Sequence, residues 1–155
     1  MAKLINDEKN IAIEWNLTEN EMLDVDLYRD SYENWIPFEV ILNIDGQEKI
    51  NLAGSSTLTL EELRRFLDES KKIISKDAGV ALLVPVECYF ELKAELIDEG
   101  DIVEIEWWFN KGVLTNGKQY GYYEGFRFFV YKNNFIMFID CLIMELNNLL
   151  NEVLI

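Results

Sequence analysis

Strict alternation of apolar and polar side chains is the feature that most constrains the fold of this chain. Residues 87–96 alternate cleanly, residues 102–110 place Val103, Ile105, Trp107 and Phe109 on one face, and residues 120–131 keep the same period with a high aromatic content. Because successive side chains of a strand point to opposite faces, such segments are half-buried strands and not helices. A turn at 97–100 and a glycine-containing loop at 111–119 separate them. The pattern predicts three antiparallel strands that pair in chain order.

Shorter alternating segments occupy the N-terminal half. They lie at 11–17, 22–28 and 36–44, and the turn Asp45-Gly46 leads into a short strand at about 48–52. An antiparallel meander is the simplest arrangement of such segments. Together with the three long strands, they predict a mostly antiparallel sheet of about six or seven strands.

Two segments have a helical period instead. Thr59-Leu-Glu-Glu62 is a capping box, in which Thr59 is the N-cap and Glu62 reaches back to it. The second segment begins at Asn133 or Asn134 and is apolar around much of its circumference, so we expect it to pack across the sheet. Apolar surface left over on it would support a homodimer. We therefore predict an α+β fold with one internal helix and a long C-terminal helix packed on the sheet. The length of 155 residues and the lack of a Pro/Gly/Ser-rich linker favour a single domain over 1–155.

The charge balance restricts the kind of partner. There are 29 acidic and 14 basic residues, a formal net charge of -15. Nucleic acid needs a positive surface, so this charge argues against nucleic acid as a partner, and a basic protein fits better. Acidity that serves only solubility stays open as an alternative.

The cysteines, the N-terminal residues and the longest apolar run indicate a reducing compartment and no membrane contact. Cys88 and Cys141 lie in apolar patterns and form no CxxC pair, so we expect buried free thiols. The N-terminus has no apolar signal-peptide segment, and the apolar run 135–144 is interrupted by Asp140 and too short to span a bilayer. These features predict a cytoplasmic protein without membrane contact.

The chain contains no histidine, which removes the commonest general base and the commonest zinc ligand. The pairs Asp24/Asp26 and Glu104/Glu106 could hold a hard cation or serve a glycosidase. Alternation in an acidic strand produces such pairs without any chemistry. We therefore predict no catalytic residue, no metal ligand and no cofactor.

Trp107 and Trp108 are neighbours in the segment EIEWWFN, so only one of them can enter the core. Trp107 shares its face with apolar residues, whereas Trp108 shares its face with glutamates. If the three long strands pair in order, the Trp108 face becomes an acidic and aromatic patch suited to binding protein. An alternative is that a helix covers the aromatic half and leaves the glutamates as a solvated rim. The partner-binding residues that we predict are Trp108, Glu104, Glu106, Glu91, Tyr89 and Tyr123.

From about residue 57 onwards the order of elements resembles that of a known family. A capped Leu-rich helix is followed by a strand opened by Glu87, a glycine-turned hairpin with an aromatic strand, and a C-terminal helix. This order resembles small bacterial immunity proteins of the WapI type, which protect a cell from a contact-dependent polymorphic toxin. The residues that carry the resemblance are Phe90 and Leu92 in the strand and Phe135, Phe138, Leu142 and Leu146 in the last helix.

The resemblance implies a non-enzymatic inhibitor that binds and neutralises a cognate toxin domain. Many such toxins are basic nucleases, and an acidic surface suits masking their nucleic-acid groove. Three other functions stay open at this point. One is an enzyme that uses paired carboxylates, with or without a divalent metal, and another is an acidic mimic of DNA that binds DNA-binding proteins broadly. The third is a structural or assembly protein that dimerises through its C-terminal helix.

Overall fold

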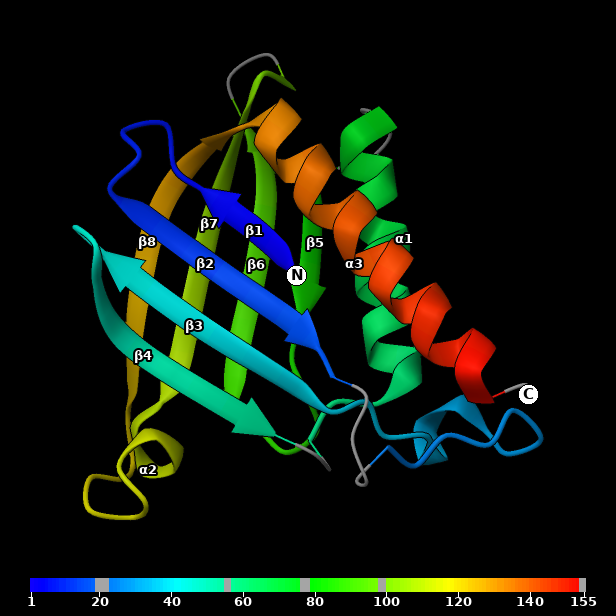
Figure 1. Cartoon of the computed structure of the whole chain (residues 1–155). Helices are drawn as coiled ribbons and strands as arrows, with labels where there is room; N and C mark the ends of the chain where they lie inside the picture. Colours follow the sequence, from blue (N-terminus) through cyan, green and yellow to red (C-terminus); the bar gives the residue numbers. More distant parts are fainter. Residues whose placement is uncertain (19–22, 55–56, 76–78, 98–99, 154–155) are drawn as a thin grey trace.

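Two antiparallel four-stranded sheets form the body of the molecule in the computed structural model, which describes residues 1–18, 23–54, 57–75, 79–97 and 100–153 (Figure 1). In each sheet the strands follow one another in chain order. The first sheet consists of β1 (Ala2–Ile5), β2 (Ile11–Leu17), β3 (Phe38–Ile44) and β4 (Gln47–Gly54). The second consists of β5 (Val80–Leu83), β6 (Phe90–Ile97), β7 (Ile102–Asn110) and β8 (Tyr123–Tyr131).

The two sheets lie face to face, and their strands cross obliquely (Figure 1). Aromatic rings fill the space between them. Trp15 of β2 lies edge-on to Phe90 of β6 and to Trp107 of β7, with ring centroids 5.8 Å and 5.7 Å apart. Phe38 of β3 meets Phe90 in the same way at 5.4 Å. The alternating segments therefore bury their apolar faces against each other.

The two long helices, α1 (Leu60–Ser75) and α3 (Lys132–Val153), lie side by side along one side of the sandwich (Figure 1). α1 packs mainly on β5, and α3 packs mainly on β1 and β2. Two short helices, η1 (Ser31–Glu33) and α2 (Lys111–Leu114), lie in the connections. Neither long helix covers the outer face of the second sheet, where Trp108, Phe129 and Tyr131 are exposed. No helix within the described ranges is long and apolar enough to cross a membrane.

The predicted capping box of α1 is confirmed. One carboxylate oxygen of Glu62 accepts from the backbone nitrogen and from the hydroxyl of Thr59, both at 2.9 Å. The other oxygen accepts from the backbone nitrogen of Val86 at 2.9 Å. Because Glu62 is buried, these bonds satisfy a charge that would otherwise be costly to bury. The same side chain thus starts α1 and holds the loop that leads into β6.

The predicted α+β class is confirmed, but several details differ. The described residues form eight strands instead of the six or seven expected, because β1 and β5 were not expected. Residue 22 lies outside the described residues, and 23–28 contribute only a single bridge between Asp24 and Trp35 instead of a strand. Of the predicted turn at 97–100, residues 98 and 99 also lie outside the described residues. Finally, α3 begins at Lys132, before either asparagine expected to cap it.

Candidate protein-binding surface

The outer face of the second sheet carries three rows of side chains across β6, β7 and β8. Glu91 lies opposite Trp108, which lies opposite Gly125. We use the name "outer face" for these rows together with the exposed Tyr123 and Tyr131 at the two ends of β8. The second row consists of Lys93, Glu106 and Arg127, and the third consists of Glu95, Glu104 and Phe129.

Trp108 is fixed on this face by its neighbours although 42% of its surface is exposed. Its ring lies so close to the backbone of Gly125 that a Cβ atom at position 125 would be 2.1 Å from the indole Cε3. The indole Nε1 donates to Glu106 Oε2 at 3.4 Å. A glycine inside a strand often marks such a close approach, and here it makes room for the ring. The exposed indole is therefore held in one orientation before any partner arrives.

The carboxylates of the outer face are partly compensated by two cations. Arg127 Nη2 donates to Glu106 Oε1 at 2.9 Å, and Arg127 Nε lies 3.8 Å from Glu104 Oε1. Lys93 Nζ lies 2.6 Å from Glu95 Oε2 and 3.9 Å from Glu106 Oε1. Four carboxylates, with Glu91 included, face two cations, which leaves this surface with two uncompensated negative charges. The surface is acidic, but less so than the glutamates alone suggest.

The ion pairs change the pKa of Glu106, and this change can be tested. The hydrogen bond from Arg127 is the main cause that lowers the pKa of Glu106, with smaller contributions from Trp108 and Lys93. Carbon-detected NMR titration is therefore expected to place the Glu106 midpoint below that of an ordinary glutamate. Arg127→Ala should raise this midpoint, and Lys93→Ala should raise it less.

The sign of the effect on stability follows from the same shift. A carboxyl whose pKa is lower in the folded state stabilises the fold when it is ionised. This contribution is present above the ordinary pKa of glutamate and is lost as the pH falls through the lowered pKa. An unchanged Glu106 midpoint in Arg127→Ala would contradict the pairing seen in the structure.

The carboxylate pairs considered for metal or acid–base chemistry are engaged by arginines or backbone groups. Arg127 lies beside Glu104 and Glu106, as described above. Arg29 Nη2 lies 2.5 Å from Asp24 Oδ1, and Asp26 Oδ1 accepts from the backbone nitrogen of Tyr28 at 2.9 Å. In the part of the chain that the structure describes, no group of three or more His, Cys, Asp or Glu side chains could hold a metal ion.

Tyr123 lies on the outer face, as the alternation predicts. Its hydroxyl donates to the carbonyl of Cys88 at 3.3 Å, across the end of β7, and partial burial raises the pKa of this hydroxyl. Asn110 Nδ2 donates to the same carbonyl at 3.2 Å. Five of the six predicted residues are thus brought together on one surface: Trp108, Glu104, Glu106, Glu91 and Tyr123.

The sixth predicted residue, Tyr89, lies elsewhere. It packs partly buried against the core and lines a cavity with Ala53 of β4 and Val113 of α2. The backbone before it explains the difference. Residue 88 has a φ of 48°, in a turn closed by a hydrogen bond from Cys88 N to Pro85 O, so β6 begins only at Phe90. The alternation assumed for 87–89 was therefore wrong, and Cys88 is exposed instead of buried.

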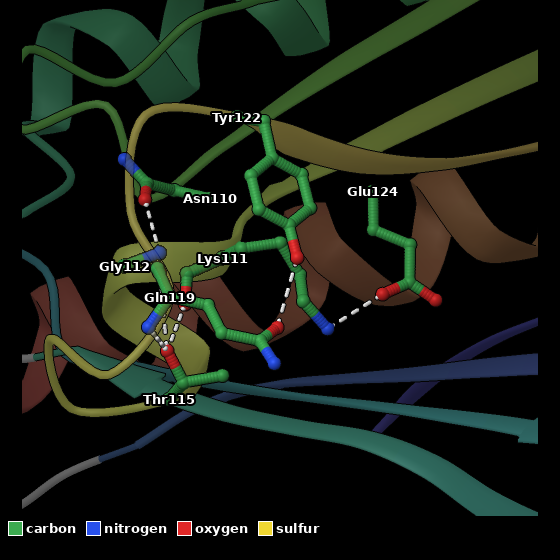
Figure 2. A network of polar contacts seen from close by, with 7 residues as sticks. All are labelled: Asn110, Lys111, Gly112, Thr115, Gln119, Tyr122 and Glu124. Carbon is green, nitrogen blue, oxygen red and sulfur yellow. Dashed lines mark hydrogen bonds and ion pairs between the residues drawn. The ribbon is translucent and has the colours of Figure 1, made fainter.

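Figure 2 shows the polar contacts that fix the connection between β7 and β8. Asn110 Oδ1 accepts from the backbone nitrogen of Gly112 at 2.8 Å and caps α2. The hydroxyl of Thr115 donates to the carbonyl of Lys111 at 2.6 Å and accepts from the backbone nitrogen of Gln119 at 2.8 Å. The long connection is thus held by its own side chains, which the sequence pattern alone did not indicate.

This connection presents two further tyrosines beside Tyr123. Tyr120 is 80% exposed and Tyr122 is 51% exposed. The hydroxyl of Tyr122 donates to Gln119 Oε1 at 2.8 Å, and the ion pair between Lys111 Nζ and Glu124 Oε2 measures 2.7 Å (Figure 2). The signal that could have identified these residues is the aromatic content of 120–131, since exposed aromatic residues on a fixed backbone are typical of binding surfaces.

Comparison with known proteins identifies one family. The model of the family described as "Immunity protein WapI-like family" matches residues 3–149, from β1 through most of α3. Nothing matches among curated proteins, and nothing matches among solved structures. The match covers the whole second sheet and hence the outer face.

Proposed function

The chain belongs to the WapI-like family of immunity proteins, and from this premise we propose that it binds a cognate bacterial toxin directly and blocks it. The family match is the observation that carries this proposal. Binding would be stoichiometric and non-enzymatic. The carboxylates that an enzyme would need are engaged in ion pairs and backbone contacts within the fold.

The outer face is the surface that we propose for the toxin. It combines exposed aromatic side chains with a tryptophan that is already fixed in place. Tryptophan, tyrosine and arginine dominate the energetics of protein interfaces, and side chains fixed beforehand lose less entropy on binding. Trp108, Tyr123 and Arg127 supply all three residue types within two neighbouring strands.

The charge of the molecule supports a basic partner such as a nuclease. A net charge of -15 creates a negative potential around the whole chain, and the outer face itself keeps two uncompensated carboxylates. Opposite charges of this kind raise association rates by roughly 10- to 1000-fold at low salt. Selective binding of one toxin would distinguish this function from that of a general DNA mimic.

The experiment that tests this function is a growth rescue. Candidate toxin domains encoded next to the gene for this chain are expressed from an inducible promoter, with and without the chain. Rescue from one of them, and not from an unrelated toxin, is the expected result. Purified rescuing pairs should form a complex of fixed stoichiometry in size-exclusion chromatography with light scattering. Absence of rescue from every candidate, with both proteins detected, would contradict immunity.

We also propose that the chain can form a homodimer through α3, and light scattering of the chain alone tests this. Met137 and Met144 leave apolar surface exposed on α3. If that surface joins two copies, the chain alone will have the mass of a homodimer.

A further inference from the structure

β8 is the outermost strand of the second sheet, and its pairing with β7 shows which backbone groups face outwards. It pairs with β7 in regular register from Tyr123 to Tyr131. The backbone nitrogen of Lys111 donates to the carbonyl of Tyr122, so residue 122 faces β7. The carbonyl of Phe129 instead accepts from Asp7, outside the sheet. In an antiparallel ladder the two directions alternate, so the odd-numbered residues of β8 point their N–H and C=O groups away from β7.

The other outermost strands are approached by neighbouring elements. α3 packs on β1, and Asn134 Nδ2 donates to the carbonyl of Ile5 at 3.2 Å. Glu69 of α1 accepts from the backbone nitrogen of Leu82 in β5 at 3.0 Å. α2 packs against β4. On β8, the backbone nitrogen of Asp7 donates to the carbonyl of Phe129. Among the described residues, nothing bonds to the outward backbone groups of Gly125 and Arg127.

We propose that the free edge of β8 from Tyr123 to Arg127 accepts an extended segment of the toxin as an additional strand. This inference rests on the proposed function and specifies how the partner is bound. A long, aromatic edge with free backbone groups is a liability that soluble proteins normally cover or charge. Pairing with a strand of a partner uses those groups, and the side chains beside them give specificity.

The geometry also describes the segment that would fit. An edge of five residues spans about 17 Å in a strand. Beyond Arg127 the carbonyl of Phe129 already accepts from the backbone nitrogen of Asp7, so the added strand ends there. Every second side chain of that strand would lie over the outer face, beside Tyr123, Trp108 and the Glu106–Arg127 pair. Because this face is aromatic and keeps a net negative charge, we expect apolar or cationic residues at those alternate positions.

The test compares Arg127→Pro with Arg127→Ala. Both variants remove the guanidinium, but only proline removes the outward N–H and places a ring at the edge. The bond ladder to β7 does not use the N–H of residue 127, so proline is compatible with this edge position. We expect Arg127→Pro to bind the rescuing toxin at least about 10-fold more weakly than Arg127→Ala. Circular dichroism and melting curves check that both variants are folded.

Amide hydrogen exchange of the wild-type chain gives a second measurement that needs no substitution. Adding the toxin should slow exchange at Gly125 and Arg127 by at least about 10-fold. The amides of Phe126 and Phe128 already bond to β7 and serve as internal controls, with a smaller change.

The outcomes separate this inference from the function on which it rests. If the wild-type chain binds none of the candidate toxins, the proposed function fails, and the edge proposal fails with it. If the wild type binds but both variants have equal affinity and exchange at Gly125 and Arg127 is unchanged, the edge proposal alone is wrong. Protection of both amides in the chain alone, together with a dimeric mass, would assign the edge to a second copy and overturn the toxin segment.

Discussion

Replacing Trp107 with alanine is expected to lower the free energy of unfolding by about 3–5 kcal/mol. Trp107 is fully buried between the sheets. Its ring stacks on Phe109 at 5.8 Å with an interplanar angle of 2°, and it meets Trp15 of the opposite sheet edge-on at 5.7 Å. Alanine would leave a cavity at the contact between the two sheets, because close-packed neighbours relax only partly. Urea unfolding followed by circular dichroism measures the loss.

Trp107→Phe is the matched control. The indole nitrogen of Trp107 has no hydrogen-bond partner within the described structure, so phenylalanine removes no bond and leaves a smaller cavity. Its cost should therefore be clearly below that of alanine. A loss of less than about 1 kcal/mol for Trp107→Ala would show that this side chain does not lie in the core.

The alternation of residues was sufficient to assign the two faces of β6 and β7. The bounds of the predicted strand 102–110 agree with those of β7. A slip of one residue would exchange Trp107 with Trp108, so the burial of a whole row of side chains fixes the register strongly. For this reason the sequence could predict the surface that carries Trp108, Glu104 and Glu106. The capping box at Thr59 was equally informative, because its contacts are local.

The arrangement of the layers could not be predicted in the same way. A period of two shows which side chains share a face, but a helix and a second sheet bury that face equally well. The expected packing of the last helix across the sheet followed from its broad apolar surface. In the structure, α3 closes the side of a sandwich and leaves the outer face of β5–β8 free. β1 and β5 have only four residues each, too few for alternation to identify them.

Local backbone chemistry explains the remaining differences. Asp26 and Asn34 bond to nearby backbone nitrogens, which offers the chain a turn in place of a strand around residue 26. Before β6, the positive φ of Cys88 reverses the expected direction of Tyr89. Positive φ is uncommon outside glycine and asparagine, so the residue types in that segment gave no indication of it. The fixed orientation of Trp108 depends on a further residue, Gly125, which comes into contact with it only once β7 and β8 pair.

Replacing Trp108 with alanine is expected to weaken toxin binding by about 2 kcal/mol or more, which is roughly a 30-fold increase in the dissociation constant. The exposed indole lies in the middle of the first row of the outer face, between Glu91 and Gly125. Since it is already fixed in place, it contributes contact area at a low entropic cost. The free energy of unfolding should change by less than about 1 kcal/mol, in contrast to Trp107→Ala. Titration calorimetry with the rescuing toxin, combined with urea unfolding of the free variant, measures both quantities.

Gly125→Ala tests whether toxin binding depends on the position of the Trp108 indole and not only on its presence. The added Cβ would overlap the ring of Trp108, so the ring must move although the tryptophan is retained. We therefore expect Gly125→Ala to lose a large part of the affinity that Trp108→Ala loses. Gly79→Ala serves as a control, because an added Cβ there meets no neighbour, its backbone does not have a positive φ, and the residue precedes β5, the opposite outermost strand of the second sheet. If Trp108→Ala and Glu104→Ala both bind the toxin as tightly as the wild type, the outer face is not the toxin-binding surface. In that case the aromatic residues of the β7–β8 connection become the next surface to test, since Tyr120 and Tyr122 are exposed there and the hydroxyl of Tyr122 donates to Gln119.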